Sequence, residues 1–230
     1  MIKSVIQNIL GKQGYALVRQ ETKSAFNADR IARLGSPATI IDVGVAGGTY
    51  PFYDAFPSAN IVLVEPLAEY HQSTLDNIRS KYDNVTLIES AVGEVASTAE
   101  ISIETASLGK SSLLERTALT EEATGTEKKM IEVQRLDTAI SKLGIGGPYA
   151  IKVDTEGFEL SVVRGCTALI PQVEFFIAEV SIAKRFEGSY TFEEVIGHMD
   201  SIGFAVTDML DFARPDKVGT RFMDLVFRPK

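Results

Sequence analysis

The sequence is poor in the residues from which disulfides and most zinc sites are built. Its 230 residues include one cysteine, two histidines and no tryptophan. Zinc sites need several cysteine or histidine ligands, so a zinc site is excluded. A lone cysteine cannot form a disulfide within the chain, which is typical of a reducing compartment, and a cytoplasmic location is expected. Cys166 stands among apolar neighbours in "VVRGCTALI" and is expected to be a buried small hydrophobe.

Long apolar runs and an excess of positive charge are also missing. No run approaches the roughly 20 apolar residues that a membrane-spanning helix needs, and no signal-peptide pattern is expected at the start. The 23 Lys and Arg residues against 31 Asp and Glu residues give a net charge of −8. This balance argues against nucleic acid as the main partner. With 45% hydrophobic and 23% charged residues, the composition is typical of a globular protein with one large core.

What is present is an alternation of strands and helices from about residue 36 onward. Apolar runs rich in β-branched residues lie at 38–43, 61–65, 85–88, 149–153 and 174–180, and helical segments such as 66–80 separate several of them. This pattern predicts an α/β, doubly wound parallel sheet that is buried on both faces. After a helix near 191–202, the stretches "FAVTDML" and "RFMDLVFRP" are joined only by a loop, which predicts an antiparallel pair.

Two segments fall outside this alternation. Residues 1–35 are predicted to form a helical extension before a single domain at 36–230, with one helix over 1–10 and another over 24–34. The helix over 1–10 carries an apolar stripe. This stripe could dock on its own domain, form a homodimer contact or form a peripheral membrane contact, and all three interpretations stay open. Residues 105–126 are rich in Ser, Thr, Gly and Glu, which is typical of a functional lid or a disordered loop.

A glycine turn follows the first predicted strand, in "TIIDVGVAGGTY". Gly44, Gly47 and Gly48 permit a positive φ and let a ligand approach the backbone, at the strand end where open α/β sheets bind ligands. The next strand, "NIVLVEP", ends in Glu65, 23 positions after Asp42. An acid there can accept hydrogen bonds from both ribose hydroxyls of an adenosine.

Two cofactors fit this arrangement. The dinucleotide fingerprint requires G-x-G-x-x-G, but from Gly44 the chain reads G-V-A-G-G-T. Ala46 and Thr49 therefore replace the second and third glycines, and the match is poor. S-adenosylmethionine (AdoMet) carries an ammonium and a sulfonium, which suit the acid Asp42 directly before the turn. The alternative that Asp42 only caps the turn stays open.

A second motif, "YAIKVDTEGFEL" at residues 149–160, ends an apolar strand in a cluster of charge. Strand alternation places Lys152 and Asp154 on the same side, and Glu179 lies near the end of "VEFFIAEVSI", the strand expected beside it. A buried charge is costly unless it is paired. Lys152 is therefore predicted to contact Asp154 or Glu179.

The two glutamates after Asp154 are expected to begin a helix that opens at Gly157. In the first turn of a helix, the dipole favours acids that have no catalytic role. Glu159 is assigned mainly to this helix start, whereas Glu156 is divided between the helix start and a reaction.

At this point the chain resembles the FkbM-type AdoMet-dependent methyltransferases. The resemblance spans roughly residues 38–228, and the run "IKVDTEGFELSVVRG" is its most specific part. The other resembling stretches are "IIDVGVAGGTYPFYDAFP", "IVLVEPLAEYHQ", "LIESAVGE", "KSSLL", "VQRLDTAI" and "FFIAEVS". The family's glycine loop usually carries Asn at the position of Ala46.

The resemblance implies a seven-stranded, mostly parallel methyltransferase fold and transfer of a methyl group to a hydroxyl of a sugar, a glycan or a secondary metabolite. It also implies cofactor contacts by position. The methionine end would be lined by Asp42, Gly44, Ala46 and Gly48, the ribose held by Glu65, the adenine flanked by Ser90 and Ala91, and the methyl group approached by Asp154.

Catalysis of such a transfer benefits from a base, because a sugar hydroxyl is a poor acid. The candidate bases are Asp154, Glu156 and Glu179, and Lys152 would set their charge state or stabilise an oxyanion. Both histidines, His71 and His198, are expected to be solvated rather than catalytic.

The acceptor is assigned to the polar segment, where Ser111 and Ser112 can exchange hydrogen bonds with its hydroxyls. A divalent metal held by the acids would polarise a hydroxyl instead, but none is expected because Lys152 and the helix start account for the carboxylates. A nicotinamide-dependent oxidoreductase and a non-catalytic AdoMet-binding module are the alternative functions.

Overall fold

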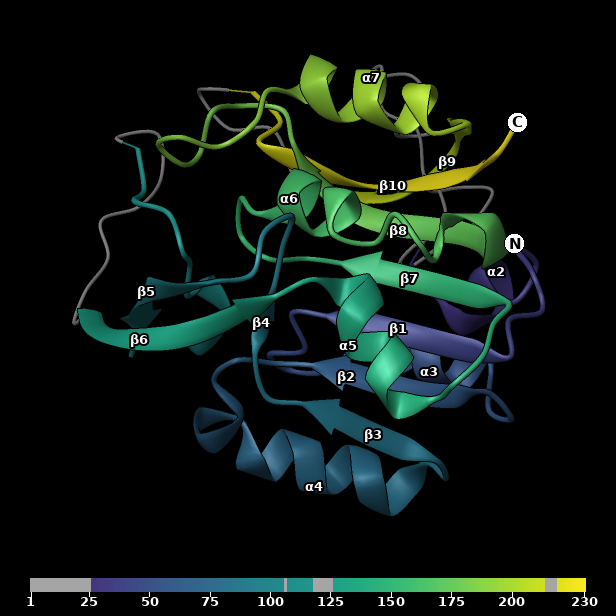
Figure 1. Cartoon of the computed structure of the whole chain (residues 1–230). Coiled ribbons are helices and arrows are strands. Elements are labelled where there is room, and N and C mark those ends of the chain that lie inside the picture. The colour runs from purple at the N-terminus through teal and green to yellow at the C-terminus, as the bar shows by residue number, and fades with distance from the viewer. Residues whose placement is uncertain (1–25, 106, 118–125, 214–218) are drawn as a thin grey trace, which may run out of the picture.

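The computed structural model describes residues 26–105, 107–117, 126–213 and 219–230. Within these ranges a seven-stranded sheet forms the centre of the molecule, in the order β3-β2-β1-β7-β8-β10-β9 (Figure 1). Neighbouring strands from β3 to β8 run parallel, and β10 is antiparallel to both β8 and β9. The strands are β1 (Thr39–Val43), β2 (Asn60–Val64), β3 (Val85–Ile88), β7 (Tyr149–Val153), β8 (Val173–Ser181), β9 (Phe204–Phe212) and β10 (Phe222–Pro229). The predicted doubly wound sheet with an antiparallel C-terminal strand is confirmed.

Helices cover both faces of this sheet. One core cluster joins the apolar side chains of α5, α6 and α7 to one face, and a second joins those of α2, α3 and α4 to the other. The helices are α2 (Ala28–Ile31), α3 (Tyr50–Ala55), α4 (Gln72–Lys81), α5 (Leu136–Leu143), α6 (Glu159–Arg164) and α7 (Phe192–Ser201). All five residues of β1 and all five of β7 are buried. Burial on two faces explains why these strands are continuous apolar runs.

A second sheet, which the sequence did not predict, lies beside the first (Figure 1). It is three-stranded within the described residues, in the order β4-β6-β5, and consists of β4 (Ala91–Val92), β5 (Ser97–Glu104) and β6 (Thr126–Gln134). Inward-facing Ile101, Ile103, Ile131 and Val133 pack on Leu67. The described part of the polar segment, 107–117, follows β5 and contains the turn η2 (Leu108–Lys110).

Of the predicted helices, two differ from their predicted bounds and one lies outside the described residues. The segment predicted at 66–80 is a 3₁₀ turn, η1 (Ala68–Tyr70), followed by α4. The helix predicted at 24–34 is limited to α2 in its described part, and the predicted helix at 1–10 lies outside the described residues. In contrast, α7 matches its predicted range, and Thr191 and Glu194 form a capping box at its start.

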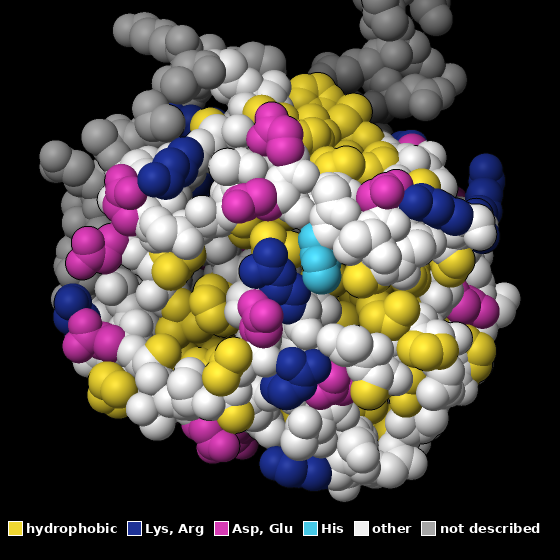
Figure 2. All heavy atoms as spheres, turned by 45° about the horizontal axis from the view of Figure 1, so that its top comes forward, with side chains coloured by type: hydrophobic (Ala, Val, Ile, Leu, Met, Phe, Trp, Pro, Cys, Tyr) yellow, Lys and Arg dark blue, Asp and Glu magenta, His cyan; other side chains and the backbone are white. Residues whose placement is uncertain are grey.

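The surface around α7 mixes charges of both signs. Figure 2 shows basic and acidic side chains interspersed across this side of the molecule, with hydrophobic side chains between them. Within the described ranges, no helix has the length and apolarity needed to cross a membrane.

Candidate active site

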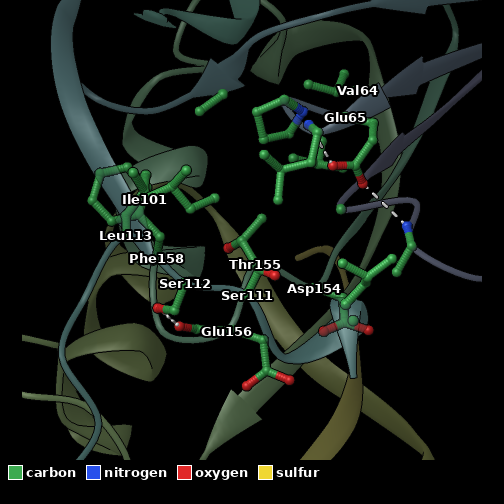
Figure 3. A pocket seen from close by; sticks show the side chains of 18 of the residues that line it. Val64, Glu65, Ile101, Ser111, Ser112, Leu113, Asp154, Thr155, Glu156 and Phe158 are labelled. Atoms are coloured by element: carbon green, nitrogen blue, oxygen red, sulfur yellow. Dashed lines mark hydrogen bonds between the residues drawn. The ribbon is translucent and has the colours of Figure 1, made fainter. Parts of the chain in front are cut away.

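A cavity that is partly open to solvent lies at the carboxyl ends of β1, β2 and β7 (Figure 3). Parallel strands present their carboxyl ends at one edge, so the loops that follow them converge there. Of the predicted site residues, those that line the cavity are Gly44, Ala46, Glu65, Ala91, Ser111, Ser112, Asp154 and Glu156. An apolar wall, including Ile101, Leu113 and Phe158, lies across the cavity from Glu65 (Figure 3).

The glycine turn after β1 is tightly packed against β7. Gly44 has a φ of +85°, and a Cβ placed on it would stand 1.8 Å from the carbonyl oxygen of Asp154. The amide of Asp154 donates to the carbonyl of Val43 at 3.0 Å. Ala46 also lies in the left-handed region, at φ +40°, which Asn tolerates better than most residues. Only glycine fits the position of Gly44.

Glu65 joins this turn to the end of β2. Its Oε2 accepts a hydrogen bond from the amide of Ala46 at 3.1 Å, and its Oε1 accepts one from the amide of Leu67 at 2.9 Å. A carboxylate has about four acceptor sites, so both oxygens retain capacity for further donors. The assignment of Glu65 to a ribose stays a prediction.

Lys152 lies beneath the cavity between two carboxylates. It is buried, and its Nζ lies 3.1 Å from Asp154 Oδ2 and 3.9 Å from Asp42 Oδ1. Burial acts to lower the pKa of Lys152, but Asp154 and Asp42 outweigh it and raise that pKa. The predicted contact with Asp154 is therefore present, and Lys152 is a fixed positive charge.

Asp42 is fully buried and lies outside the cavity lining. Its Oδ2 accepts a hydrogen bond from the hydroxyl of Tyr53, while its Oδ1 accepts none from the described residues. Burial raises the pKa of Asp42, and Lys152 opposes that shift. Asp42 thus acts on the cavity through its charge in this structure, and its direct contact with a ligand stays a prediction.

Glu179 pairs with an arginine that the sequence did not single out. Arg185 is buried, with Nη1 2.7 Å from Glu179 Oε1 and Nη2 2.5 Å from Glu156 Oε2. Arg116 of the polar segment reaches the same Glu156 oxygen at 3.6 Å. Burial raises the pKa of Glu156 to about 7, against the lowering effect of Arg185. Burial and Asp154 also raise the pKa of Glu179.

The helix predicted to open at Gly157 begins instead at Glu159. Glu156 therefore lies in the preceding loop, at a φ of +51°, and is not in a first helical turn as predicted. Glu159 is in that turn but is 2% exposed. Its Oε1 accepts from the amides of Thr155 and Gly157 at 2.8 and 3.1 Å, and its Oε2 accepts from the hydroxyl of Tyr190 at 2.5 Å. Glu159 holds the loop that carries Asp154 and Glu156, which is more than a dipole effect.

Replacing Glu159 by Gln is expected to lower the free energy of unfolding by about 1–2 kcal/mol, because hydrogen bonds to an uncharged acceptor are weaker. Glu193→Gln is the matched control, since Glu193 is an exposed acid in the first turn of α7. It should cost less than about 1 kcal/mol. Urea unfolding at neutral pH measures both, and equal losses would show that Glu159 acts only through the helix dipole.

The two predicted acceptor-binding residues, Ser111 and Ser112, line the cavity and also hold the polar segment in place. Ser112 is buried, donates to the carbonyl of Glu156 at 2.8 Å and accepts from the amide of Leu114 at 3.0 Å. Ser111 Oγ accepts from the amide of Glu104 at 3.2 Å. Both hydroxyls thus fix the polar segment, and their role toward an acceptor stays a prediction.

Besides Asp42, two cofactor assignments, Gly48 and Ser90, fall outside the cavity lining. Ser90 is buried and accepts a hydrogen bond from Gln134 Nε2 at 2.7 Å. Gly48, at φ +86°, packs beside Tyr50 and Ile78. Ala91, next to Ser90, does line the cavity.

Two residues near the site, His71 and Asp224, differ from expectation. His71 was expected to be solvated, which is wrong: it is 8% exposed and lines the cavity. Its position at the start of the helix after Glu65 was the available signal. Asp224, which was missed, lies opposite Glu179 in the β8–β10 register. Burial raises the pKa of Asp224 to about 6, with Lys152 opposing, and the signal was an acid inside the apolar run of β10.

One known protein family matches most of this chain. The model of the methyltransferase FkbM domain matches residues 42–206, a range that includes the glycine turn, Glu65 and the Lys152–Asp154 pair. The chain belongs to the FkbM methyltransferase family. It is therefore an AdoMet-dependent methyltransferase. A comparison with curated proteins finds no match.

Solved structures that are similar to this chain include several methyltransferases. A putative O-methyltransferase from Klebsiella pneumoniae shares 11% identity, with a TM-score of 0.51 over 99% of this chain and 89% of that one. The 1,6-didemethyltoxoflavin-N1-methyltransferase of Burkholderia thailandensis shares 14% identity, with a TM-score of 0.48 over 100% and 87%. The precorrin-6y C5,15-methyltransferase of Geobacter metallireducens shares 11%, with a TM-score of 0.48 over 95% and 96%. At 11% identity, the likeness to the Klebsiella pneumoniae protein concerns the fold alone.

The acids of the site are not arranged as a metal centre. Among the described residues, no group of three or more His, Cys, Asp or Glu side chains has the geometry to hold a metal ion. Their neighbours in the structure are the cations Lys152, Arg116 and Arg185.

Proposed function

We propose that this methyltransferase transfers the methyl group to a hydroxyl of a sugar, a glycan or a secondary metabolite, within a catalytic unit at residues 36–230. The observation that carries the proposal is the position of Asp154. Its side chain is 33% exposed, lines the cavity beside the glycine turn and is held at 3.1 Å by Lys152. A carboxylate that is fixed yet accessible suits the removal of a hydroxyl proton.

The residues around the cavity fit a cationic adenosyl cofactor. Gly44 leaves the backbone open where a side chain would block the approach. Glu65 offers acceptor oxygens for ribose hydroxyls, and Ala91 and His71 line the same cavity. The carboxylates of Asp42 and Asp154 attract positive charge from below. When bound, AdoMet supplies a methyl carbon that its sulfonium activates for displacement.

Asp154 is favoured as the base over the other two candidates. Glu156 and Glu179 are both tied to Arg185 at 2.7 Å or less, and Glu179 does not line the cavity. Asp154 Oδ1 is not engaged by Lys152, which contacts Oδ2. Asp154 would receive the hydroxyl proton, while Lys152 keeps the carboxylate oriented toward the cavity.

The acceptor would enter along the 107–117 segment. Ser111 and Leu113 of this segment line the cavity, and Ser112 ties it to Glu156. The apolar wall excludes water from the reacting atoms, and positioning of the acceptor oxygen supplies much of the rate. A nicotinamide-dependent oxidoreductase is disfavoured, because Ala46 and Thr49 stand where a pyrophosphate loop needs glycine.

The direct test is methyl transfer from labelled AdoMet to a panel of sugars, nucleotide sugars and hydroxylated metabolites, with products identified by mass. A labelled methyl ether supports the proposal. Transfer only to amine or thiol members of an equivalent panel would refute the hydroxyl assignment, and binding of AdoMet without transfer to any member would favour a non-catalytic module.

Glu65→Ala is expected to weaken AdoMet affinity at least about tenfold, because each lost hydrogen bond to a charged acceptor contributes roughly 1.5–3 kcal/mol. Glu69→Ala is the matched control, since Glu69 lies four residues on and pairs with Lys129 at the surface. Calorimetric titration of the folded variants with S-adenosylhomocysteine measures the effect. Unchanged affinity in Glu65→Ala would remove Glu65 from the cofactor site.

A further inference from the structure

Among the described residues, the carboxyl groups at the cavity and behind it outnumber the cations that they share. Four of them form what we call the acid cluster: Asp154, Glu156, Glu179 and Asp224. They come from different elements, since Asp154 and Glu156 follow β7, Glu179 lies on β8 and Asp224 lies on β10. Two of them, Asp154 and Glu156, line the cavity itself, and Figure 3 shows their side chains along one side of it.

Lys152 and Arg185 each contact two carboxylates. Lys152 lies between Asp154 and Asp42, and Arg185 bridges Glu156 to Glu179. Arg116 adds a third positive charge, at 3.6 Å from Glu156. Among the described residues, the other acids and phenols that act on the cluster or its neighbours include Asp42, Glu159, Asp211 and Tyr190. A buried region with more acids than cations favours retention of a proton.

We propose that the acid cluster holds a proton in the free protein and releases it when the sulfonium of the cofactor lies beside Asp154, so that AdoMet binding is coupled to proton release. The inference rests on the proposed function, because the cation in question is the cofactor of that reaction. It deepens that function by assigning Glu156, Glu179 and Asp224 a role that does not require contact with the acceptor.

The pKa shifts of the cluster agree with this assignment. Burial raises the pKa of Glu156 to about 7 and that of Asp224 to about 6, and burial together with Asp154 raises that of Glu179. Near neutral pH the free cluster is therefore partly protonated. A positive charge in the cavity favours the ionised carboxylates, lowers these pKa values and expels the proton.

The coupling prepares the base for each turnover. Once the cluster is ionised, Asp154 is available to accept a proton. Transfer forms the bond from the acceptor oxygen to the methyl carbon and breaks the bond from that carbon to sulfur, whose electron pair stays on a neutral thioether. The hydroxyl proton passes to Asp154. The acid cluster then retains this proton, because the positive charge that had favoured its ionised carboxylates is gone. Binding of the next AdoMet releases that proton to solvent.

Calorimetric titration of the full chain with AdoMet and with S-adenosylhomocysteine tests this coupling. Each is run at about pH 6.5 in two buffers of different ionisation enthalpy, below the titration of the α-amino groups near pH 8. AdoMet binding should release roughly half a proton, whereas the neutral thioether should release roughly none. AdoMet affinity should also fall about threefold per unit of pH as the pH is lowered, because the free cluster takes up protons.

Glu156→Gln should reduce the proton release at least about twofold, and Glu100→Gln should leave it at the wild-type value, because Glu100 is a surface partner of Lys128. If Glu156→Gln does not fold, Glu179→Gln serves the same purpose. Equal proton release with both ligands, or binding of both without release, would overturn this inference alone. Failure of both ligands to bind would overturn the proposed function, and the inference with it.

Discussion

Asp154→Asn is expected to lower the rate of methyl transfer at least about 100-fold, measured in single turnovers at saturating AdoMet. The amide preserves the shape of the side chain but cannot accept the hydroxyl proton. It also weakens the interaction with Lys152, which lies 3.1 Å from Asp154 Oδ2. AdoMet affinity should fall by less than about tenfold, because Asp42 and the rest of the acid cluster remain.

Glu156→Gln is the comparison that decides which carboxylate is the base. Glu156 lines the same cavity, but its carboxylate is bound to Arg185 and approached by Arg116. Its replacement should lower the rate less than about tenfold. A normal rate for Asp154→Asn together with an inactive Glu156→Gln would reverse the assignment. Repeating both with a chelator tests metal catalysis, since direct carboxylate catalysis predicts no change.

The main sheet could be predicted because its strands carry an unambiguous pattern. β1 and β7 are buried on both faces, so each is an uninterrupted apolar run between turns. The second sheet was not predicted, because its strands are half-buried. Ile101 and Ile103 face inward on β5, but Ser102 lies between them and Glu100 and Glu104 flank them. The charged run Glu127–Lys129 lies near the start of β6. Such segments are difficult to distinguish from a polar loop without the partner strand.

The acids of the site could be predicted, but most of their partners could not. Asp154 and Glu179 follow apolar runs of neighbouring strands, so their convergence is a consequence of parallel topology. Arg185 lies in an irregular loop after β8, and Asp224 enters from an antiparallel strand. Contacts between side chains of such elements depend on side-chain direction and strand register, and a single sequence has no local pattern that predicts either. The same limit hid the burial of Glu159, whose donors come from Tyr190 and from its own preceding loop.

Gly44→Ala is expected to lower the free energy of unfolding by at least about 3 kcal/mol, because it combines a strained backbone with overlap at a buried contact. The added Cβ would lie 1.8 Å from the carbonyl oxygen of Asp154, at a φ of +85°. Relief requires the ends of β1 and β7 to separate, and the hydrogen bond from Asp154 to Val43 spans that gap at 3.0 Å. Any fraction that folds should therefore lose both cofactor affinity and the position of its base.

Gly47→Ala is the matched control, because it tests whether the glycine turn rejects any added side chain or only one at Gly44. A Cβ at Gly47 meets nothing within 4 Å, and its φ lies outside the left-handed region. Its stability should stay within about 0.5 kcal/mol of wild type in urea unfolding. If Gly44→Ala proved as stable as Gly47→Ala, the contact between the turn and Asp154 could not be as close as described. Asp154 would then lose the support that fixes it beside the cofactor cavity, and its assignment as the base would lose its geometric reason.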